Sequence, residues 1–145
     1  MSNAEKIVIR TVGKPRDEGV DDLYGWFCEV FDLSGKGREM EPQILKEIVG
    51  SSMAGKGVTS LSLYKKLSVP RSTVIYHLNR FISMGLVVRK GRRYYLRSGD
   101  MESTLQELQE DVLREFNRMI EFAEMLDKSI EDVFYGRKGK RYQER

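Results

Sequence analysis

The chain has 145 residues, of which 40% are hydrophobic and 32% charged, and its formal net charge is +3. This length allows one domain with an appended element. No apolar run approaches the roughly 20 residues that a membrane span needs, and the N-terminus lacks the apolar core of a signal peptide. The single cysteine, Cys28, leaves no internal disulfide to form and fits a reducing compartment. We therefore expect a cytoplasmic protein with no membrane partner.

The small net charge conceals a sharp separation of charge along the chain. No acidic residue lies between Glu47 and Asp100, while the rest of the chain carries 15 basic and 22 acidic residues. A module of charge +10 is thus embedded in an acidic remainder of charge −7. Its basic residues are Lys56, Lys65, Lys66, Arg71, Arg80, Arg89, Lys90, Arg92, Arg93 and Arg97. Such a module is either a solvated basic face or a surface for a phosphate backbone, and the second interpretation is favoured by the pattern inside it.

Residues 1–38 are expected to form an arm and a helix. The β-branched segment 5–12 predicts a strand or an ordered arm, and residues 13–20 read as a loop. Apolar residues at helical spacing, with Asp21 and Asp22 at the start, predict a helix over 21–32 that ends at the glycines of 34–37.

A domain over residues 39–98 follows, and it begins with a helix starting near Pro42 and ending at Gly50. Residues 50–57 read as a flexible loop. Thr59 or Ser60 then caps a short helix through Leu67. The tight turn of residues 68–70 leads into a further helix from about 71 to 83, closed by Gly85.

These last two helices have the layout of a helix-turn-helix. Val74, Leu78 and Phe81 fall on one face and should pack against the preceding helices. The opposite face, together with the hairpin described next, supplies side chains that can reach phosphates or base edges. We expect DNA contacts from Ser60, Arg71, Ser72, Thr73, Ile75, Tyr76, Asn79, Arg80, Arg89, Lys90, Arg92 and Arg93.

Residues 86–97 predict a β-hairpin, because strand formers lie on both sides of Lys90-Gly91 and glycine supplies the positive φ of a tight turn. One of Tyr94 and Tyr95 should be buried, since they point to opposite faces of the strand. Basic residues cluster at the hairpin tip, where they could lie on the DNA backbone or in a minor groove.

A long helix is predicted over about 100–135. Apolar residues recur at intervals of three and four from Met101 to Val133, with one stutter between Val112 and Phe116. We expect a dimer interface made by Leu105, Leu108, Val112, Phe116, Met119, Ala123, Leu126 and Ile130. Packing back on the chain's own domain is the alternative, although the seam is longer than that domain can cover. The basic tail, 136–145, is expected to be disordered.

At residues 67–87, LSVPRSTVIYHLNRFISMGLV, followed by a basic hairpin, the chain resembles the winged helix-turn-helix transcriptional regulators of bacteria and archaea. The recognition-helix segment looks like that of the ArsR-like group, and MarR-like and TrmB-like regulators share the layout. The resemblance covers about residues 40–97. It implies a mainly α fold with a small β wing, and a homodimer on operator DNA with a recognition helix at 70–84. The cysteine pair of metal-sensing ArsR members is missing, which puts metal sensing in doubt.

The other chemistry-bearing residues favour structural interpretations. His77 is expected to pack beside the turn or touch a phosphate, and Cys28 to be a buried small apolar residue. One histidine and one cysteine do not complete a tetrahedral metal site, and no glycine-rich phosphate loop is present. We therefore expect neither an enzyme nor a cofactor or metal site.

The expected function is that of a homodimeric, sequence-specific DNA-binding transcriptional regulator, with the wing at 86–97 and double-stranded DNA as partner. Two alternatives stay open: a non-specific nucleic-acid or chromatin protein, and a winged-helix docking module of a transcription or replication complex. The sequence does not name an effector. Met and Phe residues along 116–134 could line an effector pocket, but a dimer core is favoured.

Overall fold

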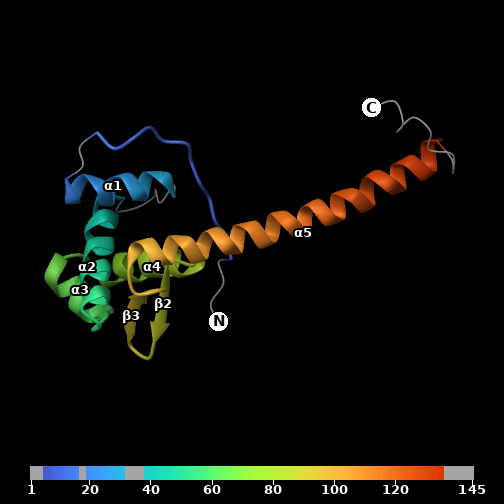
Figure 1. Cartoon of the computed structure of the whole chain (residues 1–145). Coiled ribbons are helices and arrows are strands. Elements are labelled where there is room, and N and C mark those ends of the chain that lie inside the picture. The colour runs from blue at the N-terminus through green and yellow to red at the C-terminus, as the bar shows by residue number, and fades with distance from the viewer. Residues whose placement is uncertain (1–4, 17–18, 32–37, 136–145) are drawn as a thin grey trace. The chain divides into compact units, whose positions relative to one another are not determined.

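The structure is a computed structural model that describes residues 5–16, 19–31 and 38–135 (Figure 1). It is mainly helical with a small three-stranded sheet and a long C-terminal helix. In chain order the elements are α1 (Val20–Val30), the 3₁₀ helix η1 (Arg38–Met40), α2 (Glu41–Met53), β1 (Val58–Thr59), α3 (Ser60–Leu67), α4 (Arg71–Ser83), β2 (Val87–Lys90), β3 (Arg93–Leu96) and α5 (Met101–Tyr135). The chain divides into two units, Met1–Leu108 and Gln109–Arg145, so α5 begins in the first and continues in the second.

The N-terminal segment contains the predicted helix, and residues 5–16 form an extended arm that is not a strand. The amides of Glu5 and Lys6 donate to the carbonyl of Ser83 at 2.8 and 3.2 Å, and the Arg10 amide donates to the Val30 carbonyl at 2.7 Å. The predicted alternative of an ordered arm is therefore confirmed. α1 begins at Val20, so the predicted loop over 13–20 is one residue too long. The glycines that were expected to end this helix lie outside the described residues.

Helix α2 runs past Gly50, and the prediction that this glycine ends the helix is wrong. The helix ends at Met53, and two residues later Gly55 takes a left-handed φ of +77° and its amide donates to the Ser52 carbonyl at 2.9 Å. A glycine ends a helix only where the backbone needs a positive φ, and Gly50 lies inside the regular turns.

The sheet has the strand order β1-β3-β2, and all its pairs are antiparallel. The hairpin β2–β3 is confirmed, but its two-residue turn is Gly91-Arg92, one residue later than predicted, because Lys90 pairs with Arg93. Gly91 has φ +65°, and the one non-glycine residue with a positive φ in the described part of the chain is Ser68. A glycine at the first turn position followed by a residue of negative φ is the II′ arrangement, which matches strand twist. β1 was not predicted.

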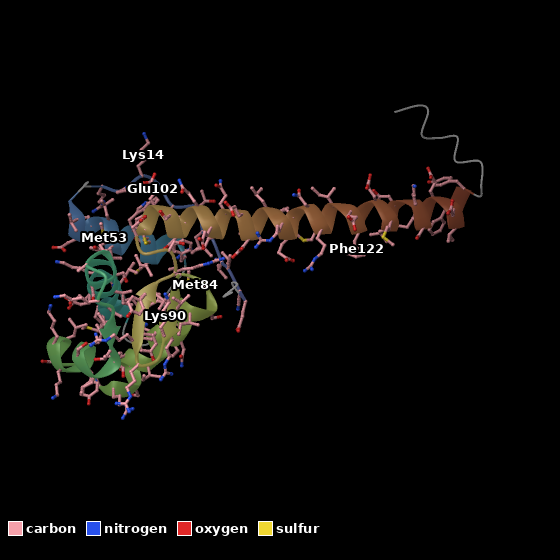
Figure 2. All side chains as sticks on the ribbon, turned by 60° about the horizontal axis from the view of Figure 1, so that its bottom comes forward. Lys14, Met53, Met84, Lys90, Glu102 and Phe122 are labelled. Atoms are coloured by element: carbon pink, nitrogen blue, oxygen red, sulfur yellow. The ribbon has the colours of Figure 1, made fainter. Side chains whose placement is uncertain are left out.

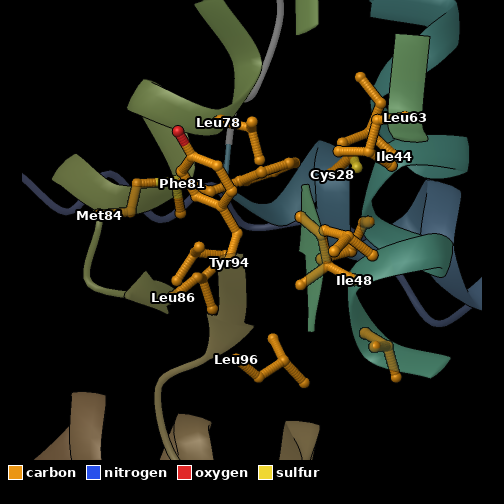
Figure 3. Packing of buried hydrophobic residues seen from close by; sticks show 14 of the residues in the cluster. Cys28, Ile44, Ile48, Leu63, Leu78, Phe81, Met84, Leu86, Tyr94 and Leu96 are labelled. Atoms are coloured by element: carbon orange, nitrogen blue, oxygen red, sulfur yellow. The ribbon is translucent and has the colours of Figure 1, made fainter. Parts of the chain in front are cut away.

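The core of the first unit lies between α2, α4 and the sheet (Figure 3). Leu78 and Phe81 of α4 are fully buried together with Ile44 and Ile48 of α2, as predicted. Tyr94 is the buried tyrosine of the β3 pair. Ser52 connects α2 to the sheet, since its hydroxyl accepts the Leu96 amide at 2.8 Å in a buried position. The sheet is thereby fixed to the helix that packs behind it.

The first turns of α5 belong to this core. The Asp100 carboxylate accepts the Ser103 amide at 2.7 Å and so caps the helix start. Leu108 is 4% exposed, Leu105 packs against the core cluster, and Thr104 is buried and accepts the Ser98 amide at 3.1 Å. The alternative of packing on the chain's own domain is therefore correct for Leu105 and Leu108, which were predicted as dimer contacts.

Candidate nucleic-acid interface

The candidate interface is built on α3 and α4, and the connection between these helices sets where α4 begins. Thr59 and Ser62 form a capping box: the Ser62 amide donates to Thr59 Oγ1 at 3.1 Å, and the Thr59 amide donates to Ser62 Oγ at 3.2 Å. α3 ends at Leu67, the next residue, Ser68, has φ +55°, and the Val69 amide donates back to the Tyr64 carbonyl at 3.3 Å. Pro70 then precedes α4 in an extended conformation that suits a helix start. The predicted tight turn of residues 68–70 is confirmed, and it fixes where the second helix begins.

Helix α4 has one buried and one open face. Its buried residues are Val74, His77, Leu78 and Phe81. The predicted contact residues divide by exposure: Arg71, Ser72, Tyr76 and Asn79 are exposed, while Thr73, Ile75 and Arg80 are half-buried. Ser60 is half-buried at the first position of α3, directly after the cap residue Thr59. The exposed residues of the open face therefore offer one guanidinium, one amide and two kinds of hydroxyl.

Tyr76 and Arg80 act together on this face. Arg80 Nη1 donates to the Tyr76 hydroxyl at 3.1 Å, and its guanidinium carbon lies 5.6 Å from the centre of the Tyr76 ring. The two side chains are one helical turn apart, which is why they meet. The contact holds the cation against the ring and orients the phenol at the surface.

The hairpin β2–β3 carries a second group of cations, three of which are held in place. Arg89 Nε donates to the Gly91 carbonyl at 2.8 Å, and its guanidinium lies 5.6 Å from the centre of the Tyr94 ring. Lys90 (labelled in Figure 2) is the last residue of β2, and its Nζ lies 5.3 Å from the centre of the Tyr95 ring. Arg92 occupies the exposed turn itself. Cation–π contacts of this kind fix the stem of a cationic side chain and leave charge at the surface.

Arg93 has a different position, because it reaches the loop before β1. Its Nη1 lies 3.4 Å from both the Lys56 and the Gly57 carbonyl oxygens. This brings Lys56, which was not among the predicted contacts, beside the hairpin. A Cβ on Gly57 would lie 2.7 Å from the Tyr95 ring, so glycine is needed for this close approach. The two-residue strand β1 creates the proximity, and a strand this short leaves no periodic signal in the sequence.

Acidic residues outside the interval 48–99 neutralise part of the charge of the basic module. Lys66 pairs with Glu47 at 2.9 Å, and Arg97 pairs with Glu107 of α5 at 2.9 Å. The cations of the α4 open face and the hairpin are instead arranged around tyrosine rings and carbonyl groups. The positive charge is therefore concentrated at α4 and the hairpin.

His77 lies beneath the open face and is excluded from any phosphate contact, because it is 1% exposed. Its Nδ1 lies 3.7 Å from an oxygen of Glu41, which is equally buried at the start of α2. The structural interpretation of His77 is correct, but its neighbour is a carboxylate rather than the turn. Glu41 was missed, since a glutamate at a helix start usually faces solvent.

Cys28 is also structural. It is 7% exposed in α1, and burial, with a smaller effect of the nearby Glu41 charge, raises the pKa of its thiol to about 12. The thiolate needed for redox or metal chemistry is thus scarce at neutral pH. No group of three or more potential metal ligands occurs among the residues that the structure describes.

The predicted dimer residues lie in both units. Leu105 and Leu108 are in the core of the first, whereas Phe116, Met119, Ala123, Leu126 and Ile130 are exposed on the described helix of the second, and Val112 is half-exposed. Helix α1 contacts α2, and Cys28 is buried on α1. The predicted disordered tail, 136–145, lies outside the described residues.

No protein family, curated protein or solved structure matched the chain. Over the described residues, α5 and every other helix is too short or too polar to cross a bilayer. The functional interpretation therefore depends on the surface itself.

Proposed function

We propose that the chain is a winged helix-turn-helix protein, most similar to ArsR-like regulators, that binds double-stranded DNA sequence-specifically as a homodimer and regulates transcription. α3 and α4 would be the helix-turn-helix, α4 the recognition helix, and β2–β3 the wing. The observation that carries the proposal is the coincidence of position and charge. The open face of α4 and the hairpin hold exposed hydrogen-bond donors and cations in an interval, 48–99, without one acidic residue.

The chemistry of the two parts suits different tasks. Arg71, Tyr76 and Asn79 are side chains that hydrogen-bond base edges or phosphates from the major groove. Arg92 in the hairpin turn is suited to the phosphate backbone or to a narrow minor groove. The hairpin would thus add affinity that is independent of sequence, and α4 would supply the selectivity.

The homodimer is supported by the exposed apolar residues of the second unit, which recur at heptad spacing. A two-fold pair of recognition helices would lie about 34–36 Å apart, one turn of the DNA duplex. Such a pair reads an inverted repeat, because the protein symmetry is matched by the symmetry of the site.

The test is an in vitro selection of duplex fragments by the purified full chain at about physiological salt, where non-specific phosphate binding is weak. Enrichment of a pseudo-palindrome with half-sites about one helical turn apart is expected. Retention without an enriched motif would replace the proposal by a non-specific nucleic-acid protein. No retention, even at low salt, would replace it by a protein-docking module.

A further inference from the structure

The second unit carries an apolar face that is wider than a two-stranded coiled coil uses. One row of residues on α5 follows the heptad intervals of three and four and is called the seam: Phe116, Met119, Ala123, Leu126, Ile130 and Val133. A second row, called the flank, has positions seven residues apart: Leu113, Ile120, Asp127 and Phe134. All but Asp127 are apolar. The seam fills heptad positions a and d, and the flank fills position e.

The seam and the flank are adjacent on one side of the helix. At about 100° per residue, position e lies about 40° from position a, so both rows form one continuous face. An a/d stripe alone is the pattern of a coiled-coil pair, whereas an a/d/e face is the pattern of a helix inside a bundle. Each α5 therefore presents two adjoining surfaces for neighbouring helices.

This face is large and exposed. Its apolar side chains other than Ala123 are between 42% and 77% exposed. Eight such side chains leave roughly 800 Å² of apolar surface open, which equals the area that one partner buries in a standard interface. Monomeric proteins seldom expose more than a few hundred Å² of apolar surface in one patch, so we expect this face to be buried against a partner.

We propose that four copies of the chain assemble through α5 as a pair of dimers, with the seam holding each two-fold dimer and the flank joining the two dimers into a four-helix bundle. The first unit supplies no second long helix, since the described α1 to α4 are each 13 residues or shorter. Other copies of α5 are the matching partners. A three-stranded bundle would also use wide faces, but it breaks the two-fold pairing on which the proposed function rests.

The assembly would carry two pairs of recognition helices. A tetramer of this kind holds two operator duplexes at once, or two operators on one DNA molecule. This is a property that a dimeric regulator lacks, and it deepens the proposed function by naming the DNA arrangement that is bound.

The first measurement is the mass of the full chain in solution by light scattering at micromolar concentration. A mass of four chains of 16.8 kDa is expected. A mass of two or three chains would overturn the tetramer, and a mass of one chain would overturn both the tetramer and the homodimer. A complex that forms only with a different protein would replace the second copy by that partner.

A matched pair of variants assigns the interface to the flank. Ile120 and Met125 are 58% and 57% exposed on the same helix, but Met125 lies at position c, about 160° away from the flank. Ile120→Lys is expected to convert the tetramer into a dimer, while Met125→Lys leaves a tetramer. Circular dichroism verifies that α5 stays helical. A tetrameric Ile120→Lys variant, or a Met125→Lys variant that dissociates as well, would refute the assignment.

A bridging assay separates this inference from the proposed function. An immobilised duplex with the selected site is loaded with protein and then offered a second, fluorescent duplex. The wild type is expected to capture the second duplex, and Ile120→Lys is expected to bind the first but capture at least tenfold less of the second. Bridging that survives in Ile120→Lys would overturn the inference, whereas a tetramer that binds neither duplex would overturn only the DNA-binding proposal.

Discussion

At the residue scale, the structure separates cations that look equivalent in the sequence. Arg92 and Arg93 are neighbours in the hairpin, yet Arg92 occupies the exposed turn and Arg93 reaches the backbone carbonyls before β1. Tyr76 and Arg80 form a pair on α4. We therefore expect Arg92 and Tyr76 to act directly in binding, and Arg93 to position the loop that carries Lys56.

Substitutions at Tyr76 and Arg92 test these roles. Arg92→Ala is expected to weaken binding to selected and random duplexes alike and to reduce the salt slope by about one unit, as loss of one phosphate contact does. Tyr76→Ala is expected to cost about 1–3 kcal/mol on the selected site alone. Fluorescence anisotropy at several salt concentrations measures both. Lys14→Ala, on the arm far from the hairpin in Figure 2, is the control and should change neither. Equal losses on both duplexes for Tyr76→Ala would refute its role in reading sequence.

The raised pKa of the Cys28 thiol predicts slow alkylation of the folded protein. A folded-state pKa of about 12 leaves roughly a thousandfold less thiolate at pH 8 than a free cysteine has. Alkylation by iodoacetamide at pH 8 should therefore be at least ~10³-fold slower in the native protein than in denaturant. The thiol ionises at a lower pH in the unfolded chain than in the folded protein. Above about pH 9, burial of Cys28 therefore lowers the free energy of unfolding as the pH rises. Native labelling at the rate of the unfolded chain would show that the thiol is not buried.

Gly57 and Gly50 differ in what an added methyl group would meet. Gly57 has φ +71°, and its Cβ would lie 2.7 Å from the Tyr95 ring, whereas Gly50 is inside α2 with nothing within 4 Å. Gly57→Ala should lower the free energy of unfolding by about 1–3 kcal/mol. Gly50→Ala should raise it by up to about 1 kcal/mol, because alanine favours helix. Urea titrations compare the two, and a neutral Gly57→Ala would contradict the close packing of this loop on the hairpin.

At the element scale, the start of α3 depends on the capping box of Thr59 and Ser62. Thr59→Ala removes the side-chain acceptor for the Ser62 amide and should cost about 1 kcal/mol of stability. Thr59→Ser keeps the acceptor and is the control, expected within about 0.5 kcal/mol of wild type. If both variants unfold at the same denaturant concentration, the cap contributes nothing.

Elements with a local cause were predictable from the sequence, and contacts between distant segments were not. The helix at 71–83 is signalled by its apolar spacing and by Pro70, and the hairpin is signalled by Gly91, so these elements appear where expected. The approach of Gly57 to Tyr95 joins residues 38 positions apart in the sequence, and the burial of Glu41 beside His77 joins α2 to α4. These contacts depend on how the elements pack.

The same distinction applies to the candidate interface. Residue type and helical period placed Arg71, Tyr76 and Asn79 on the open face of α4, because a single helix face is a local property. Lys56 was missed, since its place beside the hairpin depends on pairing of β1 with β3. Leu105 and Leu108 were assigned to a partner for a related reason: the apolar spacing of three and four residues continues, with one stutter, from the core of the first unit into the second.

At the scale of the whole molecule, the two units differ in how their apolar residues are buried. The first unit buries its own core, while the apolar face of the second is exposed and, in the proposed assembly, would be covered by other copies. Association stabilises by mass action, so the unit that associates should unfold at a higher temperature as concentration rises. The two units are thus expected to respond differently to the same dilution.

Two probes distinguish the units. Trp26, the single tryptophan, lies in α1 and reports on the first unit alone, whereas ellipticity at 222 nm comes from the helices of both units and so includes the described helix of the second. Over a hundredfold range of concentration, the midpoint by ellipticity should rise by several degrees, and the midpoint by Trp26 fluorescence should stay constant. Ile120→Lys should reduce the concentration dependence, and Met125→Lys should not. If both probes give one midpoint that is the same at every concentration, the apolar face of α5 does not associate, and the homodimer and the tetramer are both excluded.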